Sequence, residues 1–167
     1  MTIRTRRIVT GHTSDGRSVL LEDSSVPHVR AVPGARFDEI WSTGALPDRL
    51  GQAPAREPTS QDGTIAPPGG GSLVRVIEMA PLGRGGMRSP MHRTRTIDYG
   101  IVIEGEVVLI LSDSEVVVGK GDVVIQRGTD HAWENRSHKS AKIAFVLLDA
   151  EFDPDLAEMI GNQELMP

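Results

Sequence analysis

Hydrophobic and polar positions alternate along much of the chain, most clearly between residues 73 and 150. LVRVIEMA (residues 73–80) alternates, and residues 98–128 are a series of valine- and isoleucine-rich runs. Turn residues separate these runs at 104–105, 112–114 and 119–121. A period of two is typical of half-buried strands. Short strands at regular spacing, with no helix between them, predict an antiparallel sandwich or barrel.

The flanking segments are more irregular. Residues 6–10, 18–22 and 28–32 predict short strands, and the apolar cluster of Phe37, Ile40 and Trp41 fits either a strand or one helical turn. Residues 51–72 are rich in proline and glycine, which indicates either a surface loop or an arm that covers a site or a partner subunit. DPDLAEMIGNQ predicts the one helix, with Asp153 as N-cap and Pro154 in its first turn.

These patterns divide the chain into three parts within one domain. Residues 1–72 are N-terminal strands and a long loop, residues 73–150 are the barrel core, and residues 151–167 are a C-terminal helix and tail. A length of 167 residues suits a single domain that buries a substantial core.

Composition narrows the chemistry. The chain has no cysteine, which excludes thiolate nucleophiles, disulfides and zinc–thiolate sites, so that a metal would be held by His, Asp or Glu. A net charge of −5 argues against general attraction to nucleic acid or to an anionic membrane. No apolar run approaches the length of a membrane span, and no apolar segment follows the basic N-terminus, so we expect a cytoplasmic protein.

One group of polar residues has the spacing of a site. His92, Thr94 and Asp98 are in phase on one predicted strand, and His131 lies on a later one. Two imidazoles and a carboxylate can hold a divalent metal and leave positions open for substrate. We therefore predict His92, Asp98 and His131 as metal ligands, with His131 and Asp98 also catalytic. The alternative is a metal-free polar network in which Asp98 accepts hydrogen bonds from the histidines.

The glycines around these residues resemble the first signature of the cupin superfamily. That signature is Gly, five residues, His-x-His, three or four residues, Glu, six residues, Gly. Gly86, His92, Asp98 and Gly105 fall on it, with Asp in place of Glu and Thr94 where the second histidine would stand. The departure at Thr94 removes one imidazole from the ligand set of the family.

The segment GDVVIQRGTDHAWEN is similar to the second cupin signature. Gly121, Gly128, His131 and Asn135 match it, and Gln126 takes the place of its proline. The resemblance implies an all-β, antiparallel jelly-roll barrel, here with an N-terminal strand extension and a short C-terminal helix. It also implies a site in the mouth of the barrel, a divalent metal (Fe, Zn, Ni or Mn) and a homodimer.

Five further residues are candidates for binding a small-molecule substrate: Thr94, Gln126, Trp133, Arg88 and Arg127. The two arginines follow turns near the motifs and could bind an anionic group. Gln126 fits equally well as a loop residue that caps a strand end, and Trp133 as a core residue.

Three functions fit these residues. The first is a metal-assisted lyase or isomerase that decarboxylates, dehydrates or isomerises a small oxygenated organic acid or ketone. The second is an iron-dependent dioxygenase. The third is a barrel that binds a small molecule without catalysis. Because one fold hosts many reactions, the choice among them depends on the site.

Overall fold

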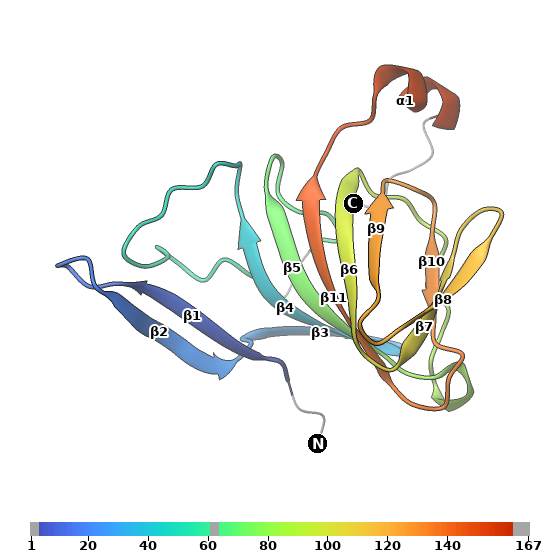
Figure 1. The fold of residues 1–167 in the computed structure, drawn as a ribbon, viewed down its shortest axis with the longest axis horizontal. Coiled ribbons are helices and arrows are strands. Elements are labelled where there is room, and N and C mark those ends of the chain that lie inside the picture. The colour runs from blue at the N-terminus through green and yellow to red at the C-terminus, as the bar shows by residue number, and fades with distance from the viewer. Residues whose placement is uncertain (1–3, 61–63, 162–167) are drawn as a thin grey trace.

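The computed structural model describes residues 4–60 and 64–161 (Figure 1). Within them the chain is almost entirely β-structure. The strands are β1 (Arg6–His12), β2 (Ser18–Ser25), β3 (His28–Val32), β4 (Ala35–Thr43), β5 (Ser72–Met79), β6 (Thr96–Glu104), β7 (Glu106–Ile110), β8 (Glu115–Gly119), β9 (Val123–Arg127), β10 (Ala132–Glu134) and β11 (Ala141–Asp149). A 3₁₀ turn covers Leu82–Arg84, and α1 covers Pro154–Ile160.

Two antiparallel sheets enclose the core. The larger sheet has the order β3-β4-β5-β11-β6-β9, and the smaller has the order β10-β7-β8. Because alternate side chains of each strand face inward, apolar residues of the two sheets meet between them. The core cluster includes Ile143, Phe145 and Leu147 of β11, Leu109 of β7 and Trp133 of β10. The predicted jelly-roll fold is thereby confirmed.

The N-terminal strands form where the pattern predicted them. β1 and β2 run further than expected, and β3 has the predicted bounds. The cluster of Phe37, Ile40 and Trp41 lies in a strand, β4, because β4 pairs with β3 on one side and with β5 on the other. β3 and β4 therefore extend the same sheet that carries β5, β11 and β6.

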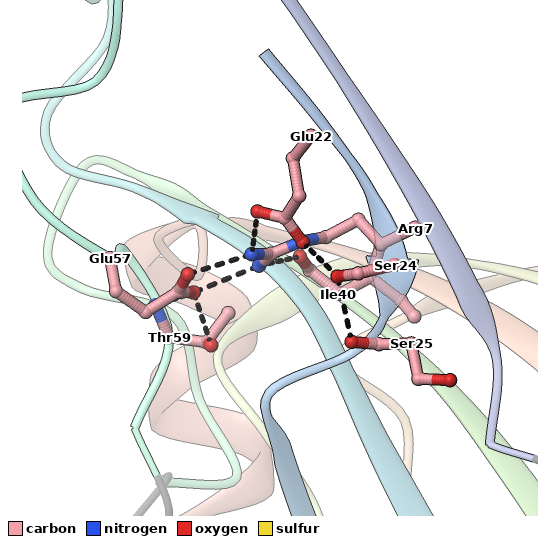
Figure 2. A network of polar contacts seen from close by, with 7 residues as sticks. All are labelled: Arg7, Glu22, Ser24, Ser25, Ile40, Glu57 and Thr59. Carbon is pink, nitrogen blue, oxygen red and sulfur yellow. Dashed lines mark hydrogen bonds and ion pairs between the residues drawn. The ribbon is translucent and has the colours of Figure 1, made fainter.

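The hairpin β1–β2 projects from the end of the large sheet that lies away from β7, β8 and β10 (Figure 1). Arg7 at its base is buried and donates hydrogen bonds to Glu22 and Glu57 at 2.7–3.1 Å and to the carbonyl of Ile40 at 3.2 Å (Figure 2). Because Glu57 belongs to the long 44–71 connection, Arg7 joins the hairpin, β4 and that connection. The connection itself contains no helix or strand in its described residues.

Local sequence accounts for two further features. Gly105 makes the β6–β7 turn at φ +74°, where an added Cβ would lie 3.0 Å from Ala141, so the turn requires glycine. Asp153 caps α1 by accepting a hydrogen bond from the Asp155 amide at 3.1 Å, with Pro154 in the first turn, as predicted. The last two residues of the predicted helical segment lie outside the described residues. No helix in the described part of the chain is long and apolar enough to span a membrane.

Candidate functional site

A cavity of about 300 Å³ lies against the inner face of the large sheet. Strands β3, β4, β5, β11 and β6 line one side of it, and β10 and the segment 87–94 line another. Its wall is mostly apolar, with Phe37, Ile77, Phe145, Leu147 and Trp133 contributing. A cavity of this size and character suits a small organic ligand.

One end of the cavity holds a hydrogen-bond network that centres on Gln126. β6 and β9 pair in register, so that Asp98 and Gln126 are direct neighbours. The amide Nε2 of Gln126 lies 3.0 Å from Asp98 Oδ2 and 3.0 Å from His131 Nε2. All three side chains are buried. Since an amide nitrogen carries two hydrogens, Gln126 can donate to both neighbours; we call this set the Gln126 network.

His92 and His131 lie side by side. Their backbones form an isolated antiparallel bridge with two N–H···O bonds of 2.9 Å, and their ring centroids are 4.1 Å apart. Each Nδ1 lies 2.9 Å from a backbone carbonyl, that of Pro90 for His92 and that of Thr129 for His131. Because a carbonyl only accepts, we assign the proton of both rings to Nδ1. Each Nε2 then carries a lone pair, and only that of His131 is engaged by Gln126.

Burial sets the protonation of this end. Burial lowers the pKa of His131 to about 4, with the neighbouring His92 acting in the same direction, so His131 is neutral at pH 7. Burial also raises the pKa of Asp98, although a hydrogen bond from Thr96 and the charge of Arg75 oppose this. Asp98 therefore holds a proton more readily than an exposed aspartate.

Comparison with known proteins gives the family. The cupin domain family matches residues 78–147. Phomopsin biosynthesis cluster protein D of Diaporthe leptostromiformis is 37% identical over 156 residues, which is 87% of this chain and 78% of that protein. The cupin-domain-containing oxidoreductase virC of Hypocrea virens is 33% identical over 154 residues, 89% of this chain and 77% of that protein. The chain belongs to the cupin family.

Among solved structures, a Cupin 2 conserved barrel domain protein from Salinispora arenicola CNS-205 is similar to this cupin. The two share 22% sequence identity with a TM-score of 0.42, over 47% of this chain and 64% of that one.

The cupin metal site is altered here. Thr94 is buried beside the cavity, and its hydroxyl lies 2.7 Å from that of Thr96. Two imidazoles and a carboxylate suit a divalent cation, but the amide of Gln126 engages both Asp98 Oδ2 and His131 Nε2. Within residues 4–60 and 64–161, no three His, Asp or Glu side chains are grouped closely enough to hold a metal ion. A metal at His92, Asp98 and His131 stays a prediction, and these side chains do not fit one as they are placed.

The remaining predicted residues divide between the cavity and the surface. Arg88 and Trp133 line the cavity, and Trp133 packs edge-to-face on Phe145 at a centroid distance of 5.7 Å. Gln126 lies within β9 rather than in a loop. Arg127 follows it, is exposed and is not among the residues that line the cavity. The structure does not bring Arg127 to the site, because alternate residues of a strand face opposite sides and Gln126 faces inward.

Several residues that were not predicted from the sequence also line the cavity of this cupin. Arg30 on β3 and Arg75 on β5 contribute charged groups, and Ile65 of the long connection contributes an apolar one. Glu39 on β4 is buried beside Arg75, with Nε and Oε2 3.3 Å apart. A signal was present in the strand sequence HVRAV, where Arg30 lies between the apolar residues Val29 and Ala31.

Proposed function

We propose that this cupin is an enzyme that moves a proton on a small oxygenated organic molecule, as in dehydration, enol isomerisation or decarboxylation. One observation carries the proposal. A histidine nitrogen with a free lone pair and a buried carboxyl oxygen without a partner, His92 Nε2 and Asp98 Oδ1, belong to residues that line one apolar cavity. A base and an acid beside one substrate site are what proton transfer requires.

His92 is the better base of the two histidines. Its Nδ1–H is held by the Pro90 carbonyl, and no hydrogen bond among the described residues engages its Nε2. His131 lacks this freedom because the Gln126 amide occupies its Nε2. We therefore assign proton abstraction to His92, and to His131 the positioning of Gln126 and the packing of the His92 ring.

Asp98 is the acid. Its Oδ2 accepts from Gln126, which fixes the carboxyl group, while Oδ1 is buried without a partner. In dehydration of a β-hydroxy ketone, His92 would take the proton from the carbon beside the carbonyl, and a carbon–carbon double bond would form. The carbon–oxygen bond to the hydroxyl would break, and the departing oxygen would take the Asp98 proton to leave as water. Transfer of the proton from His92 to Asp98 restores both groups.

A divalent metal would be an alternative to this scheme, because His92, Asp98 and His131 do not fit one as they are placed. If one binds, His92, Asp98 and His131 are the residues that would hold it, with Fe, Zn, Ni or Mn as candidates, and it would supply polarisation of a substrate carbonyl. Binding would require Gln126 to release Asp98 and His131.

The names of the relatives favour a second candidate, a redox reaction. Several similar proteins are named cupin-domain-containing oxidoreductases, among them virC and fogC, the latter of Aspergillus ruber and 36% identical over 152 residues. Relatives named for biosynthesis clusters support small-molecule metabolism in either case. Oxygen consumption with the compounds of the assay below would favour the redox reaction.

The test is proton exchange in D₂O. We would incubate the protein with β-hydroxy ketones, β-hydroxy acids and β-keto acids and follow deuterium at the carbon beside the carbonyl by ¹H NMR. We expect exchange and product formation that fall by a factor of about 100 or more in H92Q and in D98N, as is usual for loss of a general acid or base. H138Q is the matched control because His138 is exposed.

Repeating the assay after dialysis against a chelator tests whether the reaction depends on a bound metal. Activity that survives chelation supports proton transfer by the side chains alone, and activity that returns only with added metal replaces it by the metal-assisted form. Absence of exchange and turnover with every compound would contradict the proposal, as would H92Q and D98N proteins as active as H138Q.

We also propose that the chain forms a homodimer. The outer face of β6 and β9 exposes an apolar strip made by Tyr99, Ile101, Ile103, Val123 and Ile125. Contiguous exposed apolar surface of this kind is typical of interaction sites, and β9 is an unpaired edge of the large sheet. Light scattering should give a mass of two chains that falls to one in I125K; a mass near one chain for the unmodified protein would contradict the proposal.

A further inference from the structure

Arg30 has donors that nothing in the described chain satisfies. It lies on β3 and lines the cavity at the end opposite the Gln126 network in strand order. Its Nε and Nη2 are buried, and neither has a hydrogen-bond partner. A buried charged donor without an acceptor is costly. In a folded protein such a group therefore indicates a partner that is absent from the chain itself.

The aromatic ring beside Arg30 does not meet this need. Arg30 and Phe37 are direct neighbours across β3 and β4, and the guanidinium carbon lies 4.1 Å from the ring centroid. Stacking at this distance interacts with the flat face of the guanidinium. The N–H groups lie in the plane of the guanidinium, so its edge remains available for an acceptor. Phe37 thus holds the group in one orientation and leaves its donors unused.

Arg75 shows how an arginine of the same cavity is held internally. Its Nη2 donates to the Thr64 carbonyl at 2.7 Å, and its Nε forms an ion pair with Glu39 Oε2 at 3.3 Å. Burial raises the pKa of Glu39, against the charges of Arg75 and Arg30. No hydrogen bond joins Glu39 to Arg30, and the ion pair of Glu39 is with Arg75, although Arg75 Nε and both Glu39 carboxylate oxygens also lack a hydrogen-bond partner. Of the two arginines, Arg30 is the one with neither an ion pair nor a hydrogen bond among the described residues.

The cavity therefore has two unlike polar ends, with apolar residues and the internally paired Arg75 between them in strand order. Unsatisfied donors of Arg30 mark one end, and unsatisfied acceptors, Asp98 Oδ1 and Gln126 Oε1, mark the other. Phe37, Ile77, Phe145 and Leu147 are the apolar residues that the sheet contributes to the lining. A ligand that satisfies both ends carries an acceptor anion at one terminus and a hydroxyl or other proton-bearing group at the opposite terminus.

We propose that Arg30 binds the carboxylate of a small organic acid with an apolar body, so that the opposite end of the acid reaches His92 and Asp98. A carboxylate fits because a guanidinium presents parallel N–H groups that two carboxylate oxygens accept together. This proposal rests on the proposed function for the reaction at the far end, but carboxylate binding by Arg30 can be measured without any turnover.

The experiment compares matched acids and amides. Phenylacetate, 3-phenylpropionate and 4-phenylbutyrate, with their neutral primary amides, would be titrated into the full chain by calorimetry and by ¹H–¹⁵N NMR of the arginine Nε–H signals. We expect at least one acid to bind at least 10-fold more tightly than its amide and to shift the Arg30 Nε–H signal. In R30M, affinity for that acid should fall at least 10-fold, while affinity for the amide stays within 2-fold.

Two further variants, R127M and R30K, serve as controls. R127M removes an arginine that is exposed and not among the residues that line the cavity, so it should bind acids as the unmodified chain does. R30K keeps the charge without the planar fork and should retain part of the preference for acid over amide. Equal binding of acid and amide, an unchanged acid affinity in R30M, or no binding of any acid at millimolar concentration would overturn the proposal. Because acid binding is measured without turnover, binding that depends on Arg30 in a protein that turns over no compound would contradict the proposed function alone.

Discussion

Arg7 and Arg30 both lie in the N-terminal half of the chain, and both have buried guanidinium nitrogens. They differ in whether those nitrogens find a hydrogen-bond acceptor. Arg7 is 5% exposed, and its donors meet two carboxylates and a carbonyl. Arg30 has two buried nitrogens with no acceptor. The first arginine has internal partners that hold a projecting hairpin and a long connection to the sheet. The second lies on a cavity wall, and we propose that its acceptor is the carboxylate of a ligand.

The difference shows how a structural charge can be told from a binding one. Burial alone does not separate them, since both arginines have buried nitrogens. What separates them is whether the hydrogen-bond donors are satisfied within the chain. By the same criterion His131 is a positioning residue, because Gln126 engages its free nitrogen, and His92 is available for chemistry.

The largest expected difference concerns stability. R7M should lower the free energy of unfolding by roughly 2 kcal/mol, because Glu22 and Glu57 lose their buried partner. This is less than the usual cost of breaking a buried ion pair, because both carboxylates are about one-third exposed. R30M should change it by less than about 0.5 kcal/mol, because lost stacking on Phe37 is offset by removal of unpaired donors. Urea denaturation of both variants measures the free energy of unfolding. Equal decreases in R7M and R30M would contradict the contrast between Arg7 and Arg30.

A smaller effect on the free energy of unfolding should appear at low pH. Hydrogen bonds from Arg7 lower the pKa of Glu57 to about 2 from its ordinary value of 4.5. A carboxylate with a lowered folded-state pKa adds stability above pH 4.5, and this is lost as the pH falls towards 2. We expect a loss of about 1 kcal/mol over that range, allowing for solvent screening, and a weaker dependence on pH in E57Q. A pH profile in E57Q that matches the unmodified chain would remove Glu57 from this role.

The barrel and part of its site follow from sequence because their signals are local. Alternation places the strands, and the spacing of Gly86, His92 and Asp98 places one motif. The role of Gln126 did not follow, because its partners depend on the register of β6 against β9, which brings Asp98 opposite it. Arg30 was missed for a similar reason. Whether an arginine of a predicted strand finds an acceptor depends on which side chains lie across from it, and β4 offers it Phe37.

The placement of Arg127 away from the cavity has a different explanation. A position near a motif in the sequence suggested a position near the site, but β9 includes Arg127, which is exposed while its neighbour Gln126 is buried. A shift of one residue along a strand exchanges the two faces of a sheet. Proximity in sequence therefore predicts a residue at the site only when its phase on the strand is also known.

The most direct test of the account is the ionisation of His131. The Gln126 network requires a neutral ring with its proton on Nδ1, and burial lowers the pKa of this ring to about 4. ¹⁵N-histidine NMR reports the protonated nitrogen and the pKa in one pH titration without a substrate. We predict Nε2 unprotonated at pH 7, titration near pH 4, and a rise of the pKa in Q126L, which loses the amide donor to Nε2. A His131 that titrates near pH 6.5, or that carries its proton on Nε2, would contradict the network from which the roles of His92 and Asp98 were derived.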